Sequence, residues 1–114
     1  MAIKTSALKN TLATTYGTEA KFGAIYTTEP GSTAGSEPTG GTPAYARKAL
    51  SWGPATNGVV TATAVFDVPA GATIVGFGVH SAATGGTYLD GGTLTSQGFS
   101  SQGTLTVNFS YEQS

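Results

Sequence analysis

The 114-residue chain contains no cysteine, so it can form neither disulfide bonds nor thiolate metal sites. It is also poor in charge, since five Lys or Arg and six Asp or Glu residues leave a net charge of −1. An ordinary soluble domain carries about 25% charged residues, and charge is what keeps dissolved proteins apart. We therefore expect another molecule to cover much of the surface of this protein.

Three further absences narrow the classes of function. No run of about 18 apolar residues exists that would span a membrane, so no membrane partner is expected. Residues 1–6 lack the apolar run of a secretory signal, which predicts synthesis and folding in a cytoplasm. The basic residues form no cluster beyond Arg47 and Lys48, so a nucleic-acid partner is not expected either.

Glycine is abundant, with 17 residues, and Thr and Ser are frequent, which is typical of a β-rich chain with many turns. One helix is predicted at residues 4–16, because Ala7, Leu8 and Leu12 recur near a period of 3.6 and Gly17 follows as a C-terminal stop. Since this apolar stripe is narrow, we expect the helix to lie against the sheet or against a neighbouring subunit.

Residues 45–66 predict a central β-hairpin. Leu50 and Trp52, the only tryptophan, share one face of the first arm, and large apolar groups gain most from leaving water. Asn57 and Gly58 supply turn chemistry before a second arm rich in Val and Thr. The hairpin is therefore the expected core of the fold.

The remaining pattern predicts short strands and one long loop. Residues 29–43 consist almost entirely of Gly, Pro, Ser, Thr and Glu, and such long loops are usually functional or mobile. Both a flexible surface excursion and an arm that orders against a neighbour remain open. We predict one domain over residues 1–114, mainly β, an antiparallel β-sandwich or flattened barrel of about seven strands with one N-terminal helix. The other strands are expected at residues 21–28, 72–82, 87–89, 93–95 and 103–111, with a glycine turn at 90–92.

No catalytic constellation is visible. A Ser-His-Asp arrangement would need His80 with Asp67 or Asp90, yet no Gly-x-Ser-x-Gly elbow presents a nucleophile. One histidine without cysteine predicts no metal site, and the glycine pairs at 85–86 and 91–92 flank a strand instead of opening a helix around a phosphate. We predict no catalytic, cofactor-binding or metal-binding residue, and hence no enzyme. The sequence leaves open whether folding brings two carboxylates together, as in glycosidases.

Surface tyrosines are the remaining chemical feature, because aromatic rings can stack on sugars. Most of them occupy strand positions, where packing in a core or an interface is the usual role. The candidates are Tyr16, Tyr26, Tyr45, Tyr88 and Tyr111.

Five segments carry a resemblance to a known family: residues 16–18 (YGT), 45–52 from YAR to Trp52, 55–58 (ATNG), 66–74 (FDVPAGATI) and 84–89 (TGGTYL). In their order the chain resembles small virion structural proteins of tailed phages, particularly those infecting actinobacteria. Relatives of this kind are labelled tail fibre, minor capsid or head decoration proteins. The resemblance implies a virion protein made in the host cytoplasm.

Two functions from different classes follow. The first is a capsid decoration (minor capsid) protein, a homo-oligomer, most plausibly a trimer, that binds the major capsid protein and stabilises the outer shell without chemistry. The second is a tail or fibre component whose glycine-rich loops contact the host surface. An esterase or glycosidase is the third and least favoured reading.

Overall fold

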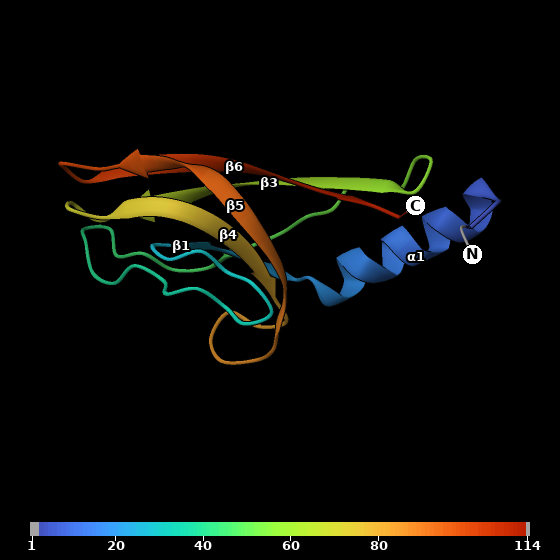
Figure 1. The fold of residues 1–114 in the computed structure, drawn as a ribbon, viewed down its shortest axis with the longest axis horizontal. Coiled ribbons are helices and arrows are strands. Elements are labelled where there is room, and N and C mark those ends of the chain that lie inside the picture. The colour runs from blue at the N-terminus through green and yellow to red at the C-terminus, as the bar shows by residue number, and fades with distance from the viewer. Residues whose placement is uncertain (1–2, 114) are drawn as a thin grey trace.

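The computed structural model describes residues 3–113, which form one helix and six strands in two antiparallel sheets (Figure 1). One sheet has the strand order β2-β1-β4-β5, and the other pairs β3 with β6. The predicted mainly β, sandwich-like antiparallel fold is confirmed, with six strands in place of about seven and two open sheets in place of a barrel. The elements are α1 (Ser6–Glu19), β1 (Phe22–Tyr26), β2 (Lys48–Ala49), β3 (Val59–Val68), β4 (Thr73–His80), β5 (Tyr88–Gly98) and β6 (Gly103–Glu112).

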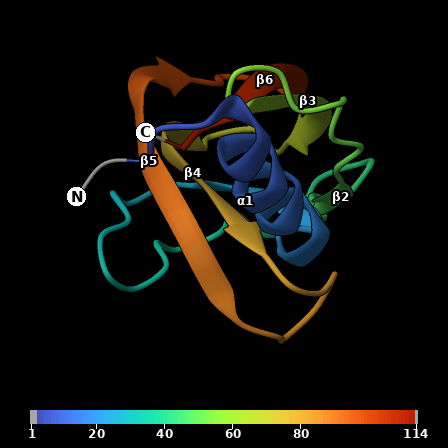
Figure 2. The same cartoon turned by 90° about the vertical axis from the view of Figure 1, so that its right-hand side faces the viewer.

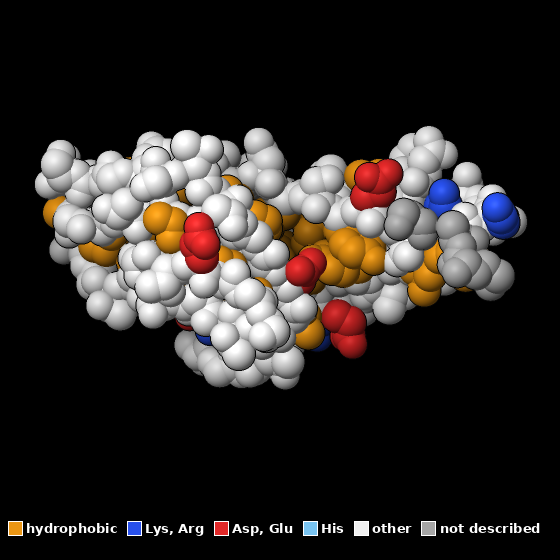
Figure 3. All heavy atoms as spheres, viewed as in Figure 1, with side chains coloured by type: hydrophobic (Ala, Val, Ile, Leu, Met, Phe, Trp, Pro, Cys, Tyr) orange, Lys and Arg blue, Asp and Glu red, His pale blue; other side chains and the backbone are white. Residues whose placement is uncertain are grey.

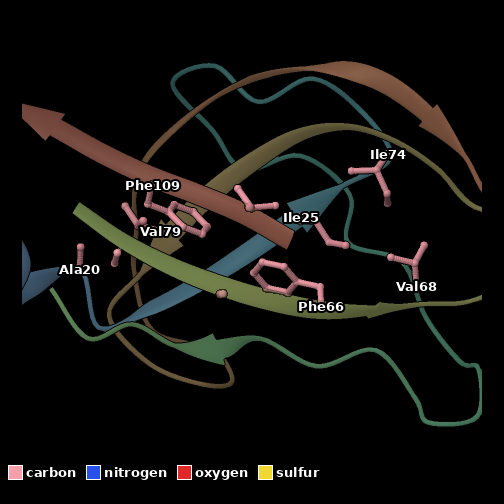
Figure 4. Close-up of a cluster of buried hydrophobic side chains, with 10 residues drawn as sticks. Ala20, Ile25, Phe66, Val68, Ile74, Val79 and Phe109 are labelled. Atoms are coloured by element: carbon pink, nitrogen blue, oxygen red, sulfur yellow. The ribbon is translucent and has the colours of Figure 1, made fainter. Parts of the chain in front are cut away.

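The hydrophobic core lies between the two sheets (Figure 4). β3 and β6 pair over ten residues, from Val59 opposite Glu112 to Val68 opposite Gly103. Along both strands buried and exposed positions alternate, because successive side chains of a strand point to opposite faces. The last predicted strand, at 103–111, is therefore confirmed. The buried cluster comprises Ala20, Ile25, Ala62, Ala64, Phe66, Val68, Ile74, Val79, Val107 and Phe109.

The central hairpin predicted at 45–66 is wrong. The Asn57-Gly58 turn exists, with φ of 50° and 79°, but it is closed only by the bridge between Thr56 and Val59. The first arm contributes the two-residue strand β2 to the other sheet, where it pairs with β1, while β3 pairs with β6. A local turn signal cannot reveal a partner strand that lies 35 to 53 residues away and whose ten-residue alternation matches better. The predicted face was correct, since Leu50 and Trp52 pack against the core.

The helix begins and ends later than the predicted 4–16. The hydroxyl oxygen of Thr5 accepts a hydrogen bond from the Leu8 amide, so Thr5 is the N-cap and precedes the first helical residue. Gly17 is not a stop, because it lies inside the helix. A Cβ at this position would lie only 3.0 Å from Cγ of Trp52. The glycine makes room for the indole, and the helix continues to Glu19. The helix extends beyond the four-stranded sheet along the long axis of the molecule, beside the ends of β3 and β6 (Figures 1 and 2).

The glycine turn predicted at 90–92 is also wrong. β5 runs through it without interruption and pairs with β4, with register shifts between Ile74 and Gly76 and between Val79 and His80. Gly92 lies under the Phe77 ring, where an added Cβ would be 2.7 Å from the ring carbons. These glycines make space for packing inside a strand, a role that looks identical to a turn in the sequence.

The loop at 29–43 is irregular, as predicted, but it lies against its own sheet. The amide of Thr27 donates to the carbonyl of Ser36 at 2.7 Å, and the Tyr88 hydroxyl donates to the carbonyl of Gly31 at 2.9 Å. Gly35 approaches the Tyr26 side chain so closely that a Cβ would be 2.8 Å away. The loop thus covers the face of β1 that points away from the core, which explains why residues 23–26 are buried on both faces.

Candidate functional site

A polar cluster joins three loops at the covered face of the β1–β4 sheet. Its centre is Glu37, from the 29–43 loop, whose carboxylate accepts hydrogen bonds from the Tyr45 hydroxyl at 2.6 Å and from Arg47 Nε and Nη2 at 3.0 and 2.9 Å. Arg47 Nη1 also donates to the carbonyls of Ala82 and Gly85. One guanidinium therefore connects the long loop, the segment before β2 and the 81–87 loop.

His80 lies beneath this cluster at the end of β4, with 3% of its surface exposed. Its Nε2 is 2.5 Å from the hydroxyl of Tyr26, which is fully buried. The Tyr45 hydroxyl, besides donating to Glu37, accepts from the Ile25 amide at 3.3 Å. The Tyr45 hydroxyl thus joins the backbone of β1 to Glu37 of the loop, while Tyr26 and His80 pair with each other, as buried polar groups require.

The cluster shifts the pKa of its members in directions that keep it intact at neutral pH. Burial would raise the pKa of the Glu37 carboxyl, but the hydrogen bonds from Arg47 and Tyr45 outweigh it and hold that pKa below its ordinary value. Burial, together with the nearby Arg47 charge, lowers the pKa of His80. Burial and the bond to Glu37 raise the pKa of Tyr45. Near pH 7, Glu37 is therefore charged and His80 neutral.

The structure does not bring His80 together with either aspartate named as a triad partner. Asp67 lies 3.6 Å from Lys48 Nζ, and Asp90 accepts from the Tyr16 hydroxyl at 2.8 Å. The polar cluster contains no serine or cysteine nucleophile, and its charged groups already bond one another. Within residues 3–113, no group of three His, Asp or Glu side chains is placed to hold a metal ion. The chemistry that this arrangement performs is to hold loops in place.

Beside the cluster the surface forms a shallow hollow of about 430 Å³. Its walls come from residues 37–40, 45–47 and 83–85, and Tyr45 supplies its aromatic surface. The tyrosines considered for sugar stacking thus separate: Tyr26 is buried, whereas Tyr45 borders a hollow.

A second surface feature, the helix groove, lies between α1, the start of β5 and the end of β6. Leu12 and Tyr16 line it from the helix, Leu89 from β5 and Tyr111 from β6, around a volume of about 330 Å³. The rings of Tyr16 and Tyr111 stack with centroids 3.8 Å apart and planes at 9°. Burial, the bond to Asp90 and that charge raise the pKa of Tyr16, so its hydroxyl stays a donor. Hydrophobic side chains gather in this hollow, with acidic side chains beside it (Figure 3).

Sequence reasoning missed both features. The polar cluster joins Glu37, Arg47 and residues 82–85, which are up to 48 positions apart, and no local spacing announces it. The helix groove has one signal in the sequence, because the apolar stripe of Leu8 and Leu12 includes Leu12, which lines the groove. In the structure these leucines are 49% and 37% exposed, and Ala13 is the buried residue of α1. The helix was expected to lie against the sheet or a neighbour; it uses its small residues for the sheets and leaves its leucines outside.

Comparison with known proteins identifies the lineage. A family model described as podophage GP4 fiber I protein gp80 matches residues 4–112, nearly the whole chain. A search of curated proteins found no match. The one helix of the described residues is not long and apolar enough to cross a membrane.

Proposed function

The chain belongs to the podophage gp80 fibre family and is a structural component of the phage virion, and from this premise we propose that it is a building block of the tail fibre. The family match carries the proposal. It favours the second of the two readings of the sequence, the tail or fibre component, over the capsid decoration protein. The more specific assignment to phages of actinobacteria rests on the resemblance alone.

The shape of the molecule supports a fibre role. Its principal extents are 47 × 23 × 22 Å, so it is about twice as long as it is wide. The scarcity of charge supports burial within an assembly, since a protein covered by its neighbours needs little charge to stay dispersed. We propose that copies of the chain associate with one another in the fibre. No catalytic step is needed for this role.

Localisation on the particle tests the proposal. Gold-labelled antibody against the purified chain, viewed on intact virions, is expected to label the tail and not the shell. Quantitative gels should show far fewer copies than of the major capsid protein. Uniform shell labelling at high copy number would instead restore the decoration reading and its contact with the major capsid protein.

Contact with the host surface is a second role that one observation favours. The hollow beside the polar cluster is bordered by Tyr45, by residues 38–40 and by the 83–85 loop, and Arg47 fixes that last loop through the carbonyls of Ala82 and Gly85. A hollow with one aromatic ring and several polar residues along its walls suits a sugar. Adsorption of the purified chain to host cells, competed by cell-wall glycans and weakened by Thr84→Trp in the hollow, would support it. Equal adsorption by that variant would refute it.

A further inference from the structure

The outward side of α1 carries an apolar stripe that its own sheets do not use. Leu8 and Leu12 are 49% and 37% exposed, one helical turn apart. Thr15 and Glu19 follow on the same side of the helix. These four positions are four, three and four residues apart, the spacing at which one helix packs along another. The opposite side of the helix holds Ala13, which is fully buried. The helix therefore has one face for its own sheets and a second, unpartnered face.

The stripe continues into the helix groove, because Leu12 belongs to both. Leu89, across the groove, is 41% exposed. Three of the four exposed large hydrophobic residues in the described chain thus lie together, and the fourth, Val65, stands apart on β3. A single exposed leucine needs no explanation, but a contiguous group marks an interaction surface.

Charge at the two ends of this surface indicates what covers it. Lys4 precedes the helix, Glu19 ends it, and Asp90 lies beside the groove through its bond from Tyr16. The ion pairs within residues 3–113 are Glu37–Arg47 and Lys48–Asp67, so Lys4 and Glu19 have no oppositely charged partner in their own described chain. The helix is basic just before its start and acidic at its end, so its outward side is complementary to itself when turned around.

We propose that the exposed stripe and the helix groove bind a second copy of this chain, with the two α1 helices antiparallel about a twofold axis near Leu12. This rests on the self-association proposed for the fibre subunit. Turning the helix about Leu12 sets position 8 of one copy opposite position 16 of the other, so the partner's Leu8 enters the groove beside Tyr16. The partner's Lys4 falls opposite residue 20, beside Glu19 and Asp90. Symmetry makes each contact occur twice.

The same charges disfavour parallel helices, the arrangement that a trimer built around this helix would require. A parallel bundle would gather the Lys4 ammonium groups at one level and the Glu19 carboxylates at another, and like charges repel. The 14 residues of α1 span about 21 Å at 1.5 Å each. A contact of that length is at the small end of protein interfaces, so the dimer is weak and reversible. Repetition along a fibre strengthens such contacts through avidity.

Sedimentation equilibrium of the full chain over a concentration series tests this. The wild-type mass is expected to rise from 11.4 kDa towards twice that value. Leu8→Glu and Leu12→Glu should each raise the dissociation constant more than about tenfold, because a charge replaces a leucine that the dimer would bury. Val65→Glu is the matched control, because Val65 is 50% exposed and lies outside the proposed dimer contact. This variant should leave the dissociation constant unchanged. Circular dichroism checks that each variant is folded.

A charge exchange tests the antiparallel direction. Lys4→Glu and Glu19→Lys should each weaken the dimer by about two- to fivefold per contact, the range for exposed ion pairs. The double variant should recover the wild-type constant. A chain that stays monomeric, a mass of three chains, or single and double charge variants that behave alike would overturn the proposal. So would a dimer indifferent to Leu12→Glu. None of these outcomes depends on where antibody labels the virion, so the fibre assignment is judged separately.

Discussion

The β3–β6 sheet and the β4–β5 strand pair solve the same packing problem in opposite ways. In β3–β6, large and small side chains project from the strands and fill the core. In β4–β5, glycines leave the strand surface bare so that aromatic rings from elsewhere can lie on the backbone. The comparison shows that a strand can be buried either by what it carries or by what it leaves out.

The side chains of β3–β6 make its burial visible in the sequence. Phe66 is fully buried and Phe109 is 2% exposed, and their ring centroids are 6.4 Å apart. Most outward positions of the two strands are occupied by Thr, Ser and Asn, and Val65 is the exposed apolar exception. This is the alternation expected of a sheet with one face on the core and one in water.

The glycines of β4 and β5 work through contacts with partners. A Cβ on Gly78 would be 2.6 Å from a ring carbon of the buried Tyr26, and one on Gly76 would be 2.6 Å from Cδ of Pro30. On the core side, Phe77 covers Gly92 and meets Phe109 edge to face at 5.5 Å. The same strand pair therefore receives rings on both faces, from its own sheet, from the 29–43 loop and from β6.

The largest expected effect is on the side-chain-filled sheet. Phe66→Ala should lower the free energy of unfolding by about 3–5 kcal/mol, because it removes a fully buried ring and leaves a cavity. Urea denaturation followed by tryptophan fluorescence measures this. Thr61→Val, on the exposed face of the same strand, is the control and should change stability by about 0.5 kcal/mol or less. A loss below about 1 kcal/mol for Phe66→Ala would show that the core between the sheets is not packed as described.

The glycine-covered pair should be sensitive to added atoms. Gly78→Ala should cost about 1–3 kcal/mol, since its methyl group would force the buried Tyr26 ring to move. Gly98→Ala, near the end of β5, is the matched control, because its Cβ would meet only Thr73 Oγ1 at 3.7 Å. Equal effects of the two alanines in urea denaturation would mean that ring packing on glycine is not what stabilises this region.

The polar cluster over the β1–β4 face should make the free energy of unfolding depend on pH, in contrast with the apolar core of β3–β6. Since the pKa of His80 is lowered from 6.5, the unfolded chain binds the proton first, and stability falls as the pH drops below about 6.5. Since the pKa of Glu37 is lowered from 4.5, its contribution is present above pH 4.5 and is lost as the pH falls through the folded-state value. Both groups therefore favour folding near neutral pH.

Thermal unfolding between pH 8 and pH 3 checks this. His80→Gln should flatten the decline that begins near pH 6.5, and Glu37→Gln the decline below about pH 4.5. A wild-type profile that is level across this range would contradict the buried cluster.

The smallest expected effect concerns the link between the two sheets. Lys48 of β2 and Asp67 of β3 approach to 3.6 Å, with 39% and 24% of their side chains exposed. Lys48→Met should cost about 0–1 kcal/mol, as for other exposed ion pairs, and the difference should vanish in about 1 M salt, where the Debye length is about 3 Å. A salt-insensitive loss would point to packing of the lysine stem and not to its charge.

The two regions also differ in how well the sequence predicts them. The β3–β6 alternation was read correctly at 103–111, because each side chain reports its own environment. The turn expected at 90–92 was wrong, because a glycine reports only a missing side chain, and the ring that fills the space comes from a distant residue. Gly17 misled in the same way, since Trp52 occupies its empty side.

The sequence by itself determined the mainly β class, the helix near the N-terminus, the irregular loop and the two-residue turn at Asn57-Gly58. All of these depend on local preferences of the backbone. Only the tertiary structure decided which strands pair, that the loop covers its own sheet through Glu37 and Arg47, and that Leu8 and Leu12 face outward. Those outcomes are set by competition among partners far apart in the chain, and the free energy of a contact depends on both of its sides.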